Sequence, residues 1–233
     1  MVGWPGLHIE SVSHRFILPI VLVLAAGVRV GVADSVQLPA PRLDGPVSLE
    51  RALGMRRSVR DYSDGALTLA EAGQLLWAAQ GITDPATGYR TAPSAGAFHP
   101  LEIRLAARRV EGLAPGLYRY QPSGHRLQLV RAGDAIPALG AAAHGQPPFA
   151  RAAAVLVISG DPARTTAKYG SRTERYLQLE AGHAAQNAAL QAAALGLGLV
   201  TVGAFDDDAL ARAAGLPAGH RPLYLLPVGR PVE

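Results

Sequence analysis

The chain has 233 residues, of which 49% are hydrophobic and 17% charged, and this composition suits one globular domain with a substantial core. It contains no cysteine, which excludes disulfides, thiolate zinc sites, cysteine-ligated clusters and cysteine nucleophiles. The net charge of +4 comes from arginines scattered between apolar runs, without the basic stripe and interleaved aromatics of a nucleic-acid surface. We therefore expect small anionic molecules, and no nucleic acid, as partners.

Residues 1–33 form a segment of a different kind. Its apolar run from Phe16 to Val28 is short for a membrane span but has the length of a signal-peptide core. The small residues Gly31 and Ala33 stand where a signal peptidase would cleave. We expect a signal peptide, and hence a periplasmic or secreted protein without a stable membrane span. An N-terminal anchor or a buried helix are the alternatives, and a misassigned start would leave a cytoplasmic protein.

Residues 34–46 are rich in proline and lack periodicity, which predicts an extended linker or arm before a domain at 47–233. In that domain, Thr68 and Glu71 form a capping-box pattern that opens a helix ending near Gly81. Alternation and helical spacing predict the remaining elements. These are helices at 48–57, 134–143, 172–195 and 206–214, and strands at 101–105, 117–120, 127–130, 155–158, 199–204 and 223–228.

The order of these elements predicts an α+β domain with a mixed, mainly antiparallel sheet. No strand is followed by the Gly-x-Gly-x-x-Gly pattern of a dinucleotide fold, so a Rossmann site is not expected. The helix at 172–195 is alanine-rich and apolar nearly all round, which predicts a place in a domain or dimer core, with His183 packed there as a core histidine. Asp206 to Asp208 are expected to cap a helix, and no metal site is predicted.

Four residues near the end of the first predicted helix could hold a phosphate group. Guanidinium groups pair bidentately with phosphate oxygens, and a serine hydroxyl adds a neutral donor. Taken alone, the same pattern also fits a solvated basic helix end. The four residues are Arg56, Arg57, Ser58 and Arg60.

Two further segments consist of small residues that would let the backbone approach a flat ring closely. An ordinary tight loop is the alternative for the first segment, and a helix stop followed by a buried strand is the alternative for the second. The segments are Pro93, Ser94, Ala95, Gly96 and Ala97 and, later in the chain, Val202, Gly203 and Ala204.

In this order and spacing, the three segments resemble the FMN-dependent nitroreductase family across nearly the whole of residues 49–231. The resemblance implies a three-layer α/β/α fold with a long central helix, FMN as cofactor, NAD(P)H as a candidate electron donor, and a homodimer with FMN at its interface. It places Arg56 to Arg60 on the flavin phosphate and the loop at Pro93 against the partner's flavin. The remaining members of the implied flavin site are Val202, Gly203, Ala204, Gly229 and Arg230.

Within the family, the sequence is similar to the branch that includes thiazoline and oxazoline dehydrogenases. The similarity rests on the stretches 76–83, 94–102 and 180–187 and on the pair Lys168 and Tyr169. Azole-forming members carry such a pair near the flavin, which implies that these two residues move a proton during hydride transfer. A surface lysine beside a packed tyrosine is the alternative.

The sequence departs from the family pattern at two places. Ala97 and His99 stand where many nitroreductases have Asn and Gln, and the chain reaches Glu233 without a further basic phosphate ligand. The resemblance implies an oxidoreductase that transfers hydride between the flavin and a small organic or azoline-like substrate. A catalytically degenerate flavin-binding accessory protein on the same fold is the alternative.

Overall fold

The computed structural model describes residues 1–3 and 35–232, and residues 35–232 form one compact unit. The expected signal peptide at 1–33 lies almost wholly outside the described residues. Within those residues, no helix is both long enough and apolar enough to span a membrane.

A seven-stranded sheet lies at the centre, in the order β1-β6-β5-β4-β7-β9-β8. Every pairing between these strands is antiparallel, while the parallel contacts in the described part of the chain are isolated bridges such as Ser58 with Leu199. The prediction of a mixed, mainly antiparallel sheet is therefore confirmed. The strands are β1 (Ser35–Gln37), β4 (Leu101–Ala107), β5 (Gly116–Gln121), β6 (Arg126–Ala132), β7 (Ala154–Gly160), β8 (Gly198–Leu199) and β9 (Arg221–Gly229), and a separate ladder joins β2 (Ile82–Asp84) to β3 (Tyr89–Arg90).

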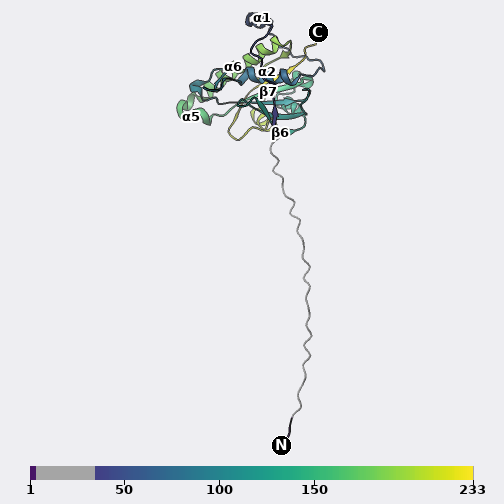
Figure 1. Cartoon of the computed structure of the whole chain (residues 1–233), viewed down its shortest axis with the longest axis vertical. Helices are drawn as coiled ribbons and strands as arrows, with labels where there is room; N and C mark the ends of the chain where they lie inside the picture. Colours follow the sequence, from purple (N-terminus) through teal and green to yellow (C-terminus); the bar gives the residue numbers. More distant parts are fainter. Residues whose placement is uncertain (4–34, 233) are drawn as a thin grey trace. The chain divides into compact units, whose positions relative to one another are not determined.

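Helices cover both faces of the sheet, which confirms the three-layer α/β/α fold (Figure 1). Alternate residues of β7 belong to two separate apolar clusters, with Leu156 in one and Val157 in the other, because successive side chains of a strand point to opposite faces. The first cluster is covered by α2 (Leu69–Gln80) and α6 (Thr173–Ala194), and the second by α3 (Ile136–Ala142), α4 (Pro148–Arg151) and α7 (Asp207–Ala213). The remaining helices are α1 (Leu49–Met55), α5 (Ala163–Tyr169) and the short 3₁₀ turns η1 (Ala95–Ala97) and η2 (Gly170–Arg172).

The helix ends follow the local chemistry of the sequence. Thr68 opens α2 with both halves of its capping box, because its side chain accepts from the Glu71 N–H and the Glu71 carboxylate accepts from the Thr68 N–H. Asp206 opens α7 by accepting from the Ala209 N–H at 2.7 Å. The predicted capping role of Asp206 is therefore confirmed.

The long helix α6 is apolar on one face only, so the prediction of a nearly all-round apolar helix is wrong for the single chain. Its alanines at positions such as 181, 184 and 188 are buried, whereas Arg175 and Leu179 point outward and are exposed. His183 also lies on this outer face, so it is not the packed core histidine that its alanine neighbours suggested.

Two other elements differ from expectation. The predicted strand at 199–204 shrinks to β8 and one bridge from Val202 to Leu225, because Pro227 in the facing strand has no N–H to donate to that ladder. The sheet also begins before residue 47, since β1 pairs with β6 and makes the first part of the 34–46 arm an edge strand.

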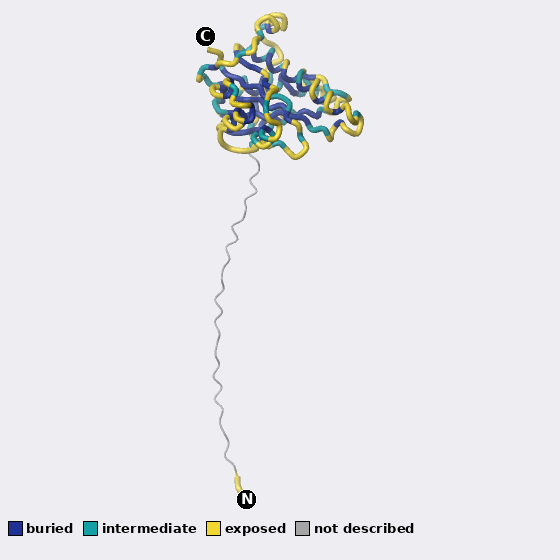
Figure 2. Tube along the Cα trace, turned by 180° about the vertical axis from the view of Figure 1, so that it is seen from behind, coloured by how far each residue is buried: buried dark blue, intermediate teal, exposed yellow. Residues whose placement is uncertain are grey.

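Helix α1 packs only lightly on the rest of the chain. Ala52 is its one buried residue, whereas Leu49, Leu53 and Met55 are 62%, 52% and 45% exposed. Figures 1 and 2 show this helix at the top of the molecule, away from the sheet and largely exposed. A helix this short gains little stability alone, so its apolar side needs a further contact.

Tyr62 fastens the stretch that follows α1 to the end of the sheet. Its side chain is fully buried, and its hydroxyl lies 2.8 Å from the carbonyl oxygen of Val59 and 2.9 Å from that of Pro227. A Cβ added at Gly229 would come within 2.9 Å of the Tyr62 side chain, so the glycine permits this close packing.

We expect Tyr62→Phe to lower the free energy of unfolding by about 1–2 kcal/mol, because the carbonyl oxygens of Val59 and Pro227 would lose the one hydroxyl proton that they share. Urea unfolding followed by circular dichroism measures this loss. Tyr89→Phe is the matched control, since Tyr89 is 63% exposed and its hydroxyl makes no hydrogen bond within residues 35–232. Equal stability of the two variants would contradict the role given to Tyr62.

Candidate functional site

The segment from Arg56 to Arg60 leaves α1 and runs alongside β8. Ser58 forms a parallel bridge with Leu199, and the Val59 N–H donates to the Leu199 carbonyl oxygen at 3.1 Å. An added Cβ at Gly198 would meet Val59 at 2.6 Å, so only glycine allows this close approach. The first predicted segment therefore lies beside the strand that leads into the third one.

The three arginines of this segment have no acidic partner. Arg56 is half-buried, and Arg57 and Arg60 are exposed. The side chains of Arg57 and Arg60 donate only to nearby backbone carbonyls, and no ion pair within residues 35–232 involves any of the three. With the exposed hydroxyl of Ser58 they form a cationic group that can hold a phosphate.

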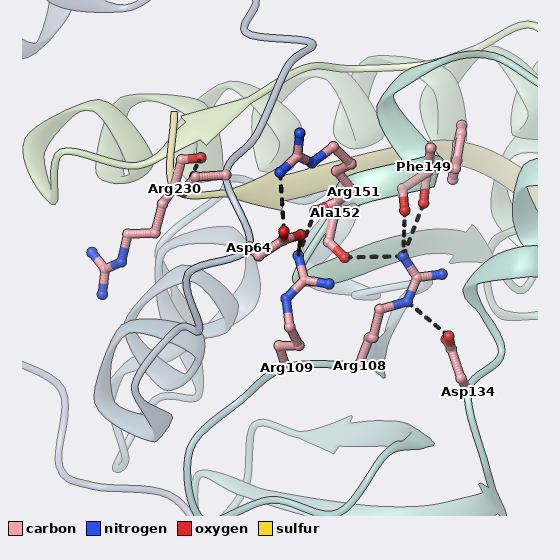
Figure 3. Close-up of polar contacts among 10 residues, drawn as sticks. Asp64, Arg108, Arg109, Asp134, Phe149, Arg151, Ala152 and Arg230 are labelled. Atoms are coloured by element: carbon pink, nitrogen blue, oxygen red, sulfur yellow. Dashed lines mark hydrogen bonds and ion pairs between the residues drawn. The ribbon is translucent and has the colours of Figure 1, made fainter. Parts of the chain in front are cut away.

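Arg230 lies near the same end of the sheet but is already bound. Its Nη2 pairs with the Glu71 carboxylate at 2.8 Å and its Nε donates to the Ala66 carbonyl at 3.2 Å. Figure 3 shows its guanidinium pointing away from the neighbouring cluster of Asp64 and Arg109. The predicted phosphate role of Arg230 would therefore require the ion pair with Glu71 to open.

Other arginines in this region serve the backbone. Arg108 donates to the carbonyl oxygens of Phe149 and Ala150 at 3.2 and 2.9 Å, and pairs with Asp134 at 2.7 Å (Figure 3). Arg109 donates to the Arg151 carbonyl at 2.7 Å. These bonds satisfy carbonyl groups at the end of α4, so part of the basic composition has a structural cause.

The turn at Val202, Gly203 and Ala204 lies where the chain leaves the sheet. Val202 is buried and exchanges backbone hydrogen bonds with Leu225 at 2.8 and 3.0 Å, whereas Gly203 and Ala204 are exposed. A Cβ at Gly203 would meet only Tyr224, at 3.4 Å, so the chain's own packing does not demand a glycine here. The hollow beside it has a volume of about 410 Å³ and is lined by Gln178, Ala181, Gly203, Phe205, Asp207, Pro222, Leu223 and Tyr224.

The loop from Pro93 to Ala97 is anchored on α6. The Ala95 N–H donates to Glu180 Oε1 at 2.8 Å, and Ser94 Oγ accepts from the His99 N–H at 2.8 Å. The Arg164 side chain donates to the His99 carbonyl at 3.0 Å. These three hydrogen bonds fix the side of the loop that faces α5 and α6, and its other side is exposed.

The backbone of this loop is strained. Ala97 and His99 have φ values of 56° and 48°, in the left-handed region that a residue with a side chain adopts at a cost, and Gly96 has φ 62°. Such strain persists only where surrounding contacts fix the backbone, and it gathers at functional sites. The geometry therefore favours a ligand-facing loop over an ordinary tight turn.

Lys168 and Tyr169 lie against the same loop, at the end of α5. A Cβ at Gly96 would approach the Tyr169 hydroxyl to 2.9 Å, and the Phe98 and Tyr169 rings meet edge to face at 6.2 Å. Lys168 Nζ lies 5.6 Å from the centre of the Phe98 ring and is exposed. The structure thus brings the predicted lysine and tyrosine to the second predicted segment.

Glu180 is a site residue to which the sequence analysis gives no role, although it begins the stretch 180–187 of the branch resemblance. It is 3% exposed, and burial raises the pKa of its carboxyl group, against which its hydrogen bonds to Ala95 and Ser94 act. The signal was present in the sequence, since Glu180 lies at helical spacing between Leu177 and Ala184 on the apolar face of α6. An acidic residue on a buried stripe needs a specific partner.

His99 takes the place of a family glutamine and is held neutral. Burial lowers the pKa of its imidazole, and the nearby cations of Arg90 and Arg164 lower it further. At neutral pH the loop therefore carries an uncharged imidazole beside its strained backbone.

The two parts of the site flank the first half of α6. Tyr176 contacts Tyr169 with ring centres 4.5 Å apart, and Glu180 holds the loop at Ala95. Ala181, the next residue along the helix, lines the hollow at Gly203. Within residues 35–232, no hydrogen bond or ion pair joins the arginine segment directly to Lys168 or Tyr169.

Comparison with known proteins covers both parts of the site. The model of the nitroreductase family matches residues 53–230. A provisionally named nitroreductase of Methanocaldococcus jannaschii is 42% identical over 200 residues, which make up 86% of this chain and 99% of that protein. The structure of a provisionally named nitroreductase from Ralstonia eutropha has a TM-score of 0.75 at 31% identity, over 88% of this chain and 93% of its own. One from Anabaena variabilis has a TM-score of 0.70 at 32% identity, over 79% of this chain and 38% of its own.

The raised pKa of Glu180 predicts how stability depends on pH. Between the carboxyl's unfolded pKa, near 4.5, and its higher folded value, the folded state holds more protons than the unfolded state. Its contribution to stability is therefore present at low pH and falls as pH rises through that window. Glutamine keeps an acceptor for the Ala95 N–H without the charge, so Glu180→Gln should gain stability over the natural protein as pH rises.

Urea unfolding between pH 4 and pH 8 measures this difference. Glu111→Gln is the control, because Glu111 is exposed and makes no ion pair within residues 35–232. If the difference in the free energy of unfolding between Glu180→Gln and the natural protein does not widen as pH rises, burial does not destabilise the charged carboxylate.

Proposed function

Because the chain belongs to the nitroreductase family of oxidoreductases, we propose that it binds FMN and transfers hydride between the flavin and a small, flat organic substrate. The observation that carries this proposal is the run of Arg56, Arg57 and Arg60, which has no carboxylate partner within residues 35–232. This run is hydrogen-bonded to β8, and β8 leads into the open turn at Gly203. A phosphate clamp and a small-residue turn thus come from adjoining pieces of backbone.

The residues present fit FMN. Arg56, Arg57, Ser58 and Arg60 would hold the phosphate, and Val202, Gly203 and Ala204 would face the ring. Gly229 contributes indirectly, because it lets Tyr62 pack closely and hold the segment from Arg56 to Arg60 against the sheet. Arg230 also contributes indirectly, through its ion pair with Glu71. When bound, FMN supplies a two-electron hydride acceptor and donor. NAD(P)H is the proposed electron donor.

We also propose that the active form is a homodimer with the flavin at its interface. The loop from Pro93 to Ala97 exposes one side, Phe98 beside it is 39% exposed, and Leu179 on the outer face of α6 is 50% exposed. The apolar residues of α1 add to this uncovered surface. Burying such residues stabilises association by roughly 25 cal/mol per Å² of apolar surface, and a second copy would bring its flavin to the loop.

Lys168 is proposed to move the proton that accompanies hydride transfer. It is the only lysine in a chain that has 22 lysines and arginines together, so cationic positions elsewhere are filled by arginine. The guanidinium of an arginine keeps its proton in proteins, whereas a lysine amine can lose its proton once it is desolvated. Tyr169 is wedged between Phe98 and Tyr176 and places its hydroxyl at Gly96, beside the strained loop.

The aromatic surroundings and the proton-transfer pair favour a planar ring such as an azoline as substrate. Phe98, Tyr169 and Tyr176 form one contiguous aromatic group, and flat rings stack on such surfaces. Oxidation of an azoline removes a proton from carbon as hydride leaves, which is the task assigned to Lys168 and Tyr169.

A flavin-binding accessory protein without turnover is the second candidate. The observation in its favour is the exposure of Lys168, whose amine makes no hydrogen bond or ion pair within residues 35–232. The two candidates differ in turnover, not in flavin content.

The phosphate clamp predicts flavin retention. The natural protein supplied with FMN should be yellow, and Arg56→Ala or Arg60→Ala should raise the dissociation constant of FMN about tenfold to a hundredfold, because each removes a charge-assisted hydrogen bond. Quenching of flavin fluorescence measures the constant. Arg51→Ala, an exposed position one turn earlier, should leave it unchanged. A natural protein without measurable FMN affinity, or unchanged affinity in both variants, would refute the proposal.

The role of Lys168 is tested by separating flavin binding from turnover. Lys168→Ala should lower kcat with an azoline or quinone substrate by about a hundredfold, while FMN affinity stays within about twofold of the natural value. Lys168→Arg should be equally slow, because the charge stays but the proton cannot leave. Arg172→Ala, exposed in η2, is the control. Full activity in both lysine variants would refute the role given to Lys168. No turnover by the natural flavoprotein with any donor and acceptor would favour the accessory protein.

A further inference from the structure

A second cavity opens between β4 and β5, on residues that the proposed flavin site does not use. These strands pair from Arg104 opposite Arg119 to Ala107 opposite Gly116, and beyond Arg104 they no longer pair. The cavity has a volume of about 330 Å³. We call it the arginine pocket, and its polar lining consists of Gln80, Arg90, Glu102, Arg119, Gln121, Ser123, Arg126 and Arg164.

The arginines of this pocket are paired mainly with neutral groups. Arg90, Arg119 and Arg126 donate to the side-chain oxygens of three glutamines at 2.7 to 2.9 Å, and none of these arginines forms an ion pair within residues 35–232. Among the arginines that line the pocket, only Arg164 forms ion pairs within residues 35–232, at 3.4 Å from Asp161 and 3.7 Å from Glu102. Arg90 has a weaker electrostatic interaction with Glu180. The pocket therefore holds a clear excess of positive charge.

Buried donors in the pocket lack acceptors. Gln80 is 1% exposed, and while its Oε1 accepts from Arg90, its Nε2 has no partner. Within residues 35–232, Arg90 Nε is buried and makes no hydrogen bond, and the same holds for Nε of the adjoining Arg104, which is 3% exposed. Arg104 Nη1 forms an ion pair with Glu102 Oε2 at 3.6 Å. A buried donor without an acceptor is destabilising, so an acceptor placed here would be stabilising.

The charges around the pocket also favour the binding of an anion. Burial lowers the pKa of the Arg90 guanidinium and Arg164 lowers it further, against smaller opposing effects from Tyr120 and Glu180. Burial likewise lowers the pKa of Arg104, where Glu102 acts in the opposite direction and Arg119 adds a smaller lowering effect. Groups whose cationic form is disfavoured by burial and by like charges gain from a nearby anion.

The rest of the wall is apolar. The apolar part of the lining consists of Ile82, Leu101, Ile103, Tyr120 and Pro122. A ligand that satisfies both parts carries oxygen acceptors with negative charge at one end and a compact apolar body at the other.

We propose that the arginine pocket binds a small organic oxyanion, a carboxylate or phosphate monoester with a compact apolar body, held by Arg90, Arg119 and Arg126 with Gln80 as an additional donor. Arg164 connects this pocket to the strained loop, since it donates to the His99 carbonyl and lies one turn before Lys168 on α5. The proposal does not depend on the flavin site, because no residue from 56 to 60 or from 202 to 204 lines the pocket.

Isothermal titration calorimetry with phenyl phosphate, benzoate and inorganic phosphate tests this proposal on the purified protein. Phenyl phosphate or benzoate should bind about tenfold more tightly than inorganic phosphate, because only they bury apolar surface. The tighter of the two organic probes identifies the head group. Absence of measurable binding of both organic probes at millimolar concentration would overturn the proposal.

Charge variants identify where the probes bind. Arg119→Gln should weaken the organic probe at least about tenfold, and Arg126→Gln, at an exposed position that folding does not need, should weaken it in the same direction. Arg131→Gln on the same strand as Arg126 is the matched control, since Arg131 is exposed, lies outside the pocket and should leave binding unchanged. Equal weakening by all three variants would mean diffuse electrostatic attraction and would overturn the site.

Arg56→Ala separates this pocket from the phosphate clamp. Probe binding that survives Arg56→Ala and is lost in Arg119→Gln supports the arginine pocket, even if FMN binding fails to appear. Binding lost in Arg56→Ala and retained in Arg119→Gln would overturn it and place the probe on the clamp.

Discussion

The contact on which the site depends is the close packing of α6 against the sheet and α2. Alanines at 181, 184 and 188 form its buried stripe, and short side chains let the helix backbone lie near its neighbours. At that distance Glu180 reaches the Ala95 N–H at 2.8 Å, while Ala181 leaves room for the hollow at Gly203. A larger side chain in this stripe would move the helix, and both parts of the site would move with it.

In the strained loop from Pro93 to His99, tertiary contacts stabilise a backbone conformation that the local sequence disfavours. The left-handed backbone at Ala97 and His99 is unfavourable, yet bonds from Glu180, Ser94 Oγ and Arg164 fix it on three sides. These donors and acceptors come from α6, from the loop itself and from α5. Because the contacts lie behind the loop, its exposed side is set in advance for whatever ligand it meets.

The sequence predicts the layered fold and most elements because their apolar spacing and caps are local. The capping box at Thr68 and the alternation in β4 to β6 are complete within a few residues, so they survive in the structure. What the sequence could not show depends on partners far along the chain. Arg230 forms an ion pair with Glu71 instead of remaining free. Helix α5 has no side-chain N-cap, so no local pattern predicts a helix at Lys168.

Because arginine has several structural roles in this protein, a single basic residue in the sequence does not identify a binding site. Arginine serves three different purposes here: it satisfies carbonyl oxygens at the end of α4, it leaves unpaired charge at 56–60, and it lines the pocket between β4 and β5. All three uses exploit a charge that never titrates near neutral pH. Lys168 stands apart as the one lysine of the chain, and it lies beside the strained loop. A chain that otherwise uses arginine thus has its single lysine where the proposed chemistry needs a proton-transfer group.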